Sequence, residues 1–242
     1  MTRIDEDYEA WEKFPEHRWI FNKLELSLKL GYDCGPACVP VRKTGNYIVR
    51  PIYNLYGMGV GARRLFLRGS EDRDDMTKHK FIPPGYFWCD WFEGNHYSID
   101  YRWSDEGKGG IHSHWEPICT TIGEQDGDLE KFTSWKKVIN HHHVLPFWLY
   151  DFAGCKELNI EYINDNILEV HLRTGNDVVH DDPVGTEIKP VWQSDTKYNK
   201  LQQGAIDSDG WQYFDNSADG ELYDASGYIK DPRVGYLKRC KL

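Results

Sequence analysis

The segment at residues 159–173, NIEYINDNILEVHLR, constrains the fold of this chain more than any other stretch. Asn164 and Asp165 tolerate a positive φ, so the pair suits a two-residue turn between strands at residues 157–163 and 166–172. Because side chains alternate between the two faces of a strand, one face of this hairpin is apolar. That face, which we expect in the core, carries Ile160, Tyr162, Leu168, Val170 and Leu172, and the opposite face carries Asn159, Glu161, Ile163, Glu169, His171 and Arg173.

The opposite face of the hairpin brings Glu161 close to Glu169 across the strand pair. Adjacent carboxylates repel one another and raise each other's pKa, and a divalent cation between them removes this repulsion. Mg²⁺ takes oxygen ligands and is often held by one or two carboxylates together with substrate phosphates. Arg173 suits a bidentate contact with a phosphate or a carboxylate. The pattern predicts a site for Mg²⁺ and a nucleotide, and it fits an exposed polar face equally well.

Composition excludes several other classes of protein. The 242 residues, 40% of them hydrophobic, suit one domain or two closely joined lobes. A net charge of −10 without long basic runs disfavours nucleic-acid binding, which needs clustered Lys and Arg. No run approaches the roughly 20 apolar residues of a membrane span, and the acidic first residues are unlike a signal peptide. The six cysteines are scattered without a CxxC pair, which predicts reduced thiols and a cytoplasmic location.

Apolar spacing and turn residues divide the chain into expected elements. Ile20, Leu24 and Leu28 recur at helical spacing within residues 17–30, and Gly31 suits the left-handed cap that ends a helix. The other expected elements are strands at residues 37–41, 47–51, 86–91 and 96–102, an extended stretch at 111–122, and helices around 135–139 and 144–150. The expected regions are a loose polar arm at 1–16, a small lobe with a glycine-rich flap at 17–85, a hinge and larger lobe with the hairpin at 86–190, and an irregular C-terminal extension at 191–242.

The hairpin resembles the metal-binding strands of the ATP-grasp superfamily, in which an acid on one strand and a Glu-x-Asn on the next hold Mg²⁺. Glu161 matches the first acid, Glu169 matches the second, and Arg173 matches the basic residue that often follows. His171 stands where Asn is usual, and a histidine can bond to phosphate or coordinate a metal. The resemblance therefore implies that Glu161, Glu169 and His171 are the metal ligands.

Three upstream segments resemble the same superfamily in the expected order. NKLELSLKLG at residues 22–31 is similar to a helix whose Lys, here Lys23, touches ATP phosphates. IVRPIYNLYGMGVG at 48–61 is similar to a strand and flap that contact phosphates, with Arg50 in place of the usual Lys. YFWCDWFEGNHYSIDY at 86–101 resembles the hinge that binds adenine and ribose. The resemblance thus implies flap contacts from Gly57, Gly59 and Gly61, adenine contacts from Asp90, Trp91 and Phe92, and a ribose contact at His96 or the nearby Glu93.

The resemblance implies an α+β fold of two lobes with ATP bound between them. It also implies an ATP- and Mg²⁺-dependent ligase that activates a small-molecule carboxylate as an acylphosphate for attack by an amine. Arg50 would then act on the phosphates, and Arg173 on the acylphosphate or the acceptor. Most members of the superfamily have a further N-terminal domain that helps to bind substrate, and few residues precede Lys23 here. We expect the C-terminal tail, a homo-oligomer or a partner subunit to supply that part.

Two other classes of protein fit parts of the sequence. A nucleotide-binding or structural protein that has lost turnover is consistent with Arg50 and His171 at their unusual positions. A metal-dependent oxygenase of cupin type is consistent with His112, His114 and Glu116, which alternation places on one strand face. The run of three histidines at 141–143 is a poor metal site, since adjacent residues on a helix do not face one ligand.

Overall fold

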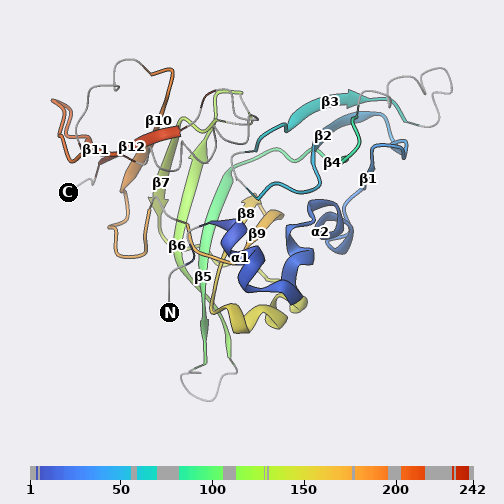
Figure 1. Ribbon diagram of the computed structural model, residues 1–242, viewed down its shortest axis with the longest axis horizontal. Coiled ribbons are helices and arrows are strands. Elements are labelled where there is room, and N and C mark those ends of the chain that lie inside the picture. Colours follow the sequence, from blue (N-terminus) through green and yellow to red (C-terminus); the bar gives the residue numbers. More distant parts are fainter. Residues whose placement is uncertain are drawn as a thin grey trace.

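A computed structural model gives the arrangement of the chain (Figure 1). It describes residues 4, 6–55, 59–69, 82–105, 113–127, 129, 131–175, 178–195, 203–215, 231 and 233–239. Two antiparallel sheets, one of four strands and one of eight, are accompanied by short helices, so the chain has the expected α+β class. Among these residues no helix is both long and apolar enough to cross a membrane.

The small sheet contains β1 (Cys34–Pro36), β2 (Gly45–Pro51), β3 (Arg63–Leu67) and β4 (Tyr86–Asp90) in the order β1-β4-β2-β3. Its core gathers Tyr47, Val49 and Trp88 with Val41. The strands expected at 47–51 and 86–91 are confirmed. The strand expected at 37–41 is wrong, because Pro40 has no N–H to donate and the carbonyl of Val39 accepts the Trp88 indole N–H at 2.7 Å.

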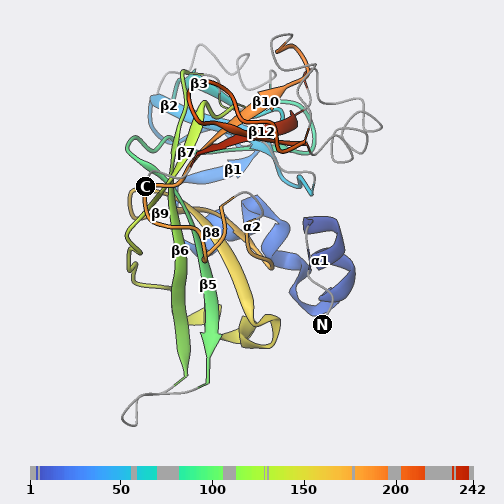
Figure 2. The same ribbon diagram turned by 90° about the vertical axis from the view of Figure 1, so that its left-hand side faces the viewer.

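The large sheet joins all the strands that follow the linker after β4 in the described part of the chain. Its members are β5 (His96–Ser104), β6 (His114–Glu124), β7 (Ser134–Val138), β8 (Glu157–Ile163), β9 (Asn166–His171), β10 (Glu187–Trp192), β11 (Gln212–Asp215) and β12 (Arg233–Arg239). The strand order is β11-β12-β10-β7-β6-β5-β8-β9. The long β5–β6 pair extends away from the small sheet, which Figures 1 and 2 show from two sides.

Two regions of the large sheet differ from expectation. The helix expected around 135–139 is wrong, because β7 pairs with β6 over these residues. Ser134 and Lys137 of β7 are buried, and the Lys137 ammonium donates to the carbonyl of His180 at 2.7 Å. Outside the sheet, the helix expected around 144–150 is a 3₁₀ helix at residues 147–155. The extension at 191–242 is not wholly irregular, since β12 pairs with β10 and β11, where Trp211 and Leu237 are buried.

Three short helices precede the first strand: α1 (Asp7–Lys13), the 3₁₀ helix η1 (Pro15–Phe21) and α2 (Lys23–Lys29). The single helix expected at 17–30 is therefore split at Asn22, whose side chain caps α2 by accepting the N–H of Glu25 at 3.0 Å. Gly31 adopts the expected positive φ, at 79°. Residues 7–13 are not a loose arm, because Ala10 is fully buried in the core that α1 shares with β8 and β9.

The 157–172 hairpin is confirmed in its strands, turn and pairing. Asn164 has a φ of 51°, and Glu161 pairs with Glu169. A register shift between Glu161 and Tyr162 puts Ile167 into the core, at 4% exposure. Leu168 therefore lines a cavity, which corrects the expectation that it lies in the core.

The hairpin turn is bound to the linker between the two sheets. Asn164 accepts the N–H of Asn95 at 3.1 Å and donates to the carbonyl of Glu93 at 3.1 Å. Gly94 has a φ of 144°, and a Cβ added there would lie 2.1 Å from Asn164 Nδ2. The link between the sheets thus needs glycine at this position.

We expect Gly94→Ala to lower the free energy of unfolding by about 1–3 kcal/mol, the typical range for a strained backbone residue. Urea unfolding followed by tryptophan fluorescence measures this change. The matched control is Gly45→Ala, because a Cβ at Gly45 meets nothing within 4 Å. Equal midpoints for the two variants would contradict the assigned role of Gly94.

Candidate functional site

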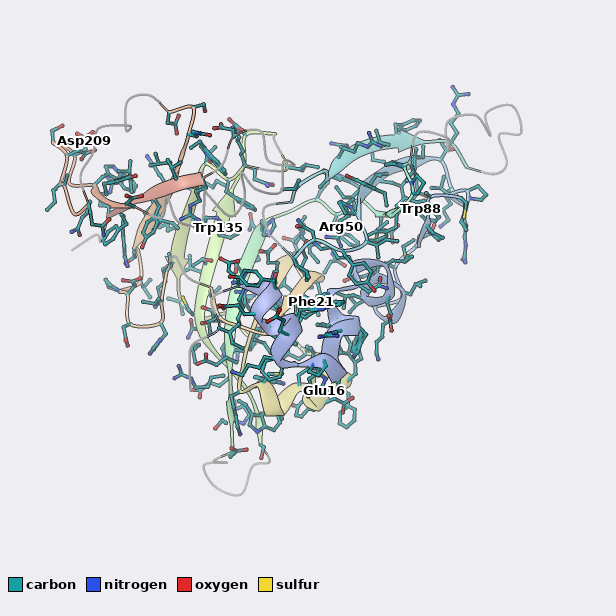
Figure 3. The ribbon with its side chains drawn as sticks, in the orientation of Figure 1. Glu16, Phe21, Arg50, Trp88, Trp135 and Asp209 are labelled. Carbon is teal, nitrogen blue, oxygen red and sulfur yellow. The ribbon has the colours of Figure 1, made fainter. Side chains whose placement is uncertain are left out.

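A cavity of about 1050 Å³ lies between the two sheets. Figure 3 labels Arg50 of β2 on the side of the small sheet and Trp135 of β7 on the side of the large sheet, and both line the cavity. Most of the site residues expected from the sequence line it together: Lys23, Arg50, Gly59, Asp90, Trp91, Phe92, Glu93, His96, Glu161, Glu169, His171 and Arg173. Gly57 lies outside the described residues, and Gly61 packs against the hydroxyl of Tyr86.

Glu169 is the meeting point of two cationic side chains. Its Oε1 accepts hydrogen bonds from Lys23 Nζ at 2.5 Å and from Arg50 Nη1 at 3.2 Å. Arg50 Nη2 also donates to the carbonyl of Leu168 at 3.0 Å. The Lys23 and Arg50 side chains are only 8% and 10% exposed. The helix α2 and the strand β2 thus bring two cations to the carboxylate that β9 presents.

Glu161, on β8, faces a histidine. His96 Nε2 lies 3.2 Å from Glu161 Oε2. Burial alone would raise the pKa of Glu161, but the hydrogen bond and charge of His96, with the charges of His171 and Lys23, lower it to about 2. The carboxyl is therefore ionised at neutral pH. The His96 ring is held edge-on against Phe132 and Trp135.

Asp7, in the first turn of α1, completes the charge network and was missed in the sequence. It is 1% exposed, and it binds His171 Nδ1 through Oδ2 at 2.7 Å and Arg173 Nε through Oδ1 at 2.9 Å. Burial alone would raise the pKa of Asp7, and the charges of His171 and Arg173 hold it well below its usual range. Ala10 and Phe14, at helical spacing within an acidic stretch, were the available sign that this segment docks on the core.

The contact between Asp7 and His171 also shifts the pKa of the His171 imidazole. Burial lowers the pKa of its imidazole, and Asp7 outweighs burial and raises that pKa. Nε2 lies 3.9 Å from Glu161 Oε1 and 3.8 Å from Glu169 Oε2, too far for hydrogen bonds. A protonated imidazole has no lone pair for a metal, so His171 would serve as the expected ligand only after Nε2 loses its proton, with Nδ1 held by Asp7. It fits a fixed positive charge between the two carboxylates.

The donor set of the cavity fits Mg²⁺ through carboxylates alone. Among the described residues no three His, Cys, Asp or Glu side chains are grouped to hold a metal. Mg²⁺ needs only one or two carboxylates when substrate phosphates supply further oxygens, and Glu161 and Glu169 supply such a pair. Arg50 Nε is buried and has no hydrogen-bond partner in the described part of the chain, which leaves a donor for an anion.

The oxygenase site is not assembled in the described residues. His112 lies outside them, and Glu116 is exposed on β6. The histidine run has aromatic partners instead, because His141 stacks on Tyr97 and His143 stacks on Tyr162. These rings have packing roles.

The linker after β4 closes one end of the cavity with aromatic rings. The Phe92 ring packs against Tyr32 at 4.8 Å, and the Arg64 guanidinium lies 4.7 Å from the Trp91 ring. Asp90 Oδ2 accepts the N–H of Asp33 at 2.8 Å. This end combines aromatic rings with charged side chains, and flat aromatic surfaces suit a flat heterocycle.

Comparisons with known proteins found solved structures that are similar to this chain, but no protein of similar sequence. No protein family and no curated protein matches the sequence. N5-carboxyaminoimidazole synthetase from Staphylococcus aureus, complexed with ADP, has a TM-score of 0.48 and 8% identity, over 93% of this chain and 68% of that chain. L-amino acid ligase from Bacillus licheniformis has a TM-score of 0.44 and 7% identity, over 95% and 72% of the two chains.

The ATP-grasp ligase PsnB, complexed with a minimal precursor, has a TM-score of 0.36 and 12% identity, over 66% of this chain and 53% of that chain. The similar structures thus include a member of the superfamily that the sequence motifs resemble. All three TM-scores lie below 0.5, so the functional assignment rests on the side chains of the cavity.

We expect Asp7→Asn to destabilise the protein by about 3 kcal/mol, because it breaks a buried ion pair. The pKa of His171 is raised in the folded state, so its stabilisation is complete below the unfolded pKa of about 6.5 and is lost as pH rises through the folded pKa. The destabilisation should therefore be larger at pH 5.5 than at pH 9, where the pair with Arg173 remains. Urea unfolding at both pH values measures this difference.

The control for this prediction is Asp151→Asn, which changes an exposed aspartate. An effect of Asp7→Asn that is the same at both pH values would show that Asp7 does not hold the proton on His171.

Proposed function

We propose that this protein is an ATP- and Mg²⁺-dependent ligase that joins a carboxylate to an amine. The observation that carries the proposal is the convergence of Lys23 and Arg50 on Glu169, directly opposite Glu161, inside a cavity between two sheets. Two buried cations beside two carboxylates match the needs of a phosphate chain and its metal ion. The resemblance of the sequence motifs to the ATP-grasp superfamily supports the same assignment.

Nucleotide binding would exchange the partners of the charged groups. Lys23 and Arg50 would turn from Glu169 to phosphate oxygens, with Arg50 offering its planar fork and its unpartnered Nε. Glu169 and Glu161 would then be available to Mg²⁺. When bound, Mg²⁺ neutralises charge on the transferred phosphoryl group and fixes its orientation.

The two ends of the cavity would take the remaining parts of the substrates. The main chain at Asp90, Trp91 and Phe92 would bind adenine, and Glu93 would bind the ribose hydroxyls, since His96 is held by Glu161. The flap glycines would cover the phosphates, because backbone without a Cβ can approach them closely.

Arg173 would hold the activated carboxylate. Its Nε is fixed by Asp7, so the guanidinium has a defined orientation beside the cavity. The carboxylate attacks the γ-phosphorus of ATP, which releases ADP and leaves an acylphosphate. The amine then attacks the acyl carbon, and the carbon–oxygen bond to phosphate breaks. Positioning and charge neutralisation provide the catalysis.

A nucleotide-binding protein without turnover is the second candidate. It is favoured by one observation: both carboxylates already have protein partners, since Glu169 binds Lys23 and Arg50, and Glu161 binds His96. If these contacts persist with nucleotide bound, the carboxylates cannot take Mg²⁺. ATP would then bind without reacting.

We expect calorimetry to detect ATP binding to the wild-type protein in the presence of Mg²⁺, with loss of affinity on addition of EDTA. Glu169→Gln should weaken the Mg²⁺-ATP affinity about tenfold or more, because it removes a ligand oxygen charge from the metal. The control Glu25→Gln changes an exposed acid on α2 and should bind as the wild type does.

Absence of ATP binding to the wild-type protein would refute the ligase proposal. Assays of ADP release with the standard L-amino acids as carboxylates and amines separate the two candidates. Binding without ADP release across this set would support the protein without turnover.

A further inference from the structure

A second row of polar side chains lies beside the two carboxylates on the large sheet. In the first row Glu161 of β8 faces Glu169 of β9. In the next row Asp100 of β5 pairs with Asn159 of β8, which pairs with His171 of β9. Residues two apart on a strand are separated by about 7 Å, so Asp100 lies one such step from the row of Glu161. Both rows line the same cavity.

One oxygen of Asp100 is fully engaged. Oδ1 accepts hydrogen bonds from Asn159 Nδ2 and from the N–H of Gly175, each at 2.8 Å. Asn159 Nδ2 is fixed in turn by the Ser98 hydroxyl at 2.8 Å. In the part of the chain that the structure describes, the hydrogen bonds to the Asp100 carboxyl group both end on Oδ1. Asp100 is 5% exposed and lines the cavity, so Oδ2 is the atom that remains for a ligand.

The surface beside Asp100 is apolar and small. Cys119, Val178 and Ile188 form one buried cluster, and all three line the cavity. The Cys119 thiol donates to the carbonyl of Val178 at 3.6 Å, and burial raises its pKa to about 12. Cys119 therefore stays protonated and belongs to the wall, not to the nucleophiles.

Three charged or titratable groups face Asp100 from the neighbouring elements: Arg173 after β9, Glu157 on β8 and Cys119 on β6. Burial raises the pKa of Asp100 to about 6, against the lowering effects of the Gly175 N–H, the Asn159 amide and the charge of Arg173. A carboxyl group with this pKa is mostly ionised at pH 7 and readily takes up a proton.

We propose that Asp100 binds and deprotonates the amine substrate, while Cys119, Val178 and Ile188 hold a small apolar substituent of that amine. The inference rests on the proposed ligase function and names its acceptor as a small primary amine. The ammonium group gives one proton to Asp100 Oδ2 and becomes a neutral amine. The amine nitrogen attacks the acyl carbon, its second proton leaves with inorganic phosphate, and Asp100 releases the first proton to solvent.

Binding of n-propylammonium chloride, followed by ligand-observed NMR at pH 7.5 with and without Mg²⁺ and a non-hydrolysable ATP analogue, tests the pocket. We expect binding to the wild-type protein and a loss of about tenfold or more in Asp100→Asn, because a hydrogen bond to a charged group is lost. Glu116→Gln, an exposed change on β6, is the matched control. Equal binding to Asp100→Asn, or none to the wild-type protein, overturns the proposal.

A measurement on the wild-type protein covers the case in which Asp100→Asn does not fold. Propylammonium affinity should decrease as pH falls through about 6, where Asp100 becomes protonated. The isosteric neutral alcohol 1-propanol should show no such dependence. An affinity for propylammonium that is constant between pH 5 and 7.5 overturns the proposal.

Rates of product formation with two nucleophiles show whether Asp100 acts as a base or has only a structural role. With Mg²⁺-ATP and a reacting carboxylate from the L-amino acid set, Asp100→Asn should lower amide formation from propylamine by about 100-fold or more. It should spare hydroxamate formation from hydroxylamine, which is already neutral at pH 7. Equal loss with both nucleophiles overturns the role as base. Absence of ATP binding in the calorimetry instead refutes the ligase proposal itself, whatever the amine result.

Discussion

The β8–β9 hairpin places two carboxylates opposite each other in the cavity, and the structure depends on protein partners that balance their negative charge. Glu161 and Glu169 are paired across the strands, and an unpaired buried charge is far more costly than a paired one. Their partners come from separate elements: Lys23 from α2, Arg50 from β2 and His96 from β5. Because Arg50 belongs to the small sheet, the same ion pairs hold that sheet against the large one.

Asp7 extends this dependence to the N-terminal helix. It holds His171 and Arg173, and both belong to the second strand of the hairpin or its continuation. Docking of α1 therefore fixes the charge of one side chain and the orientation of another at the site. A helix that contributes only two buried residues, Asp7 and Ala10, thus acts on the site through His171 and Arg173.

Local patterns were sufficient to predict the hairpin and insufficient to predict its partners. Alternation gave the pairing of Glu161 with Glu169, because strand geometry depends on near neighbours alone. The contact between Asp7 and His171 joins residues 164 positions apart, and no periodicity encodes it. The misassigned strand β7 has the same cause: its burial pattern is set by the neighbouring β6 and β10, since the propensity of so short a segment is weak.

Under the proposed ligase function, the neutralisation of both carboxylates by protein side chains predicts that ATP and Mg²⁺ would bind as a pair. ATP alone would draw Lys23 and Arg50 away from Glu169 and leave it facing Glu161 without those counter-ions. Mg²⁺ alone would enter beside the ammonium of Lys23, which lies 2.5 Å from the same carboxylate oxygen. When both enter together, Glu169 would exchange Lys23 and Arg50 for the metal, and these two released cations would gain phosphate oxygens. His171 stays bound to Asp7 through Nδ1 beside both carboxylates, and this contact does not depend on Lys23 or Arg50.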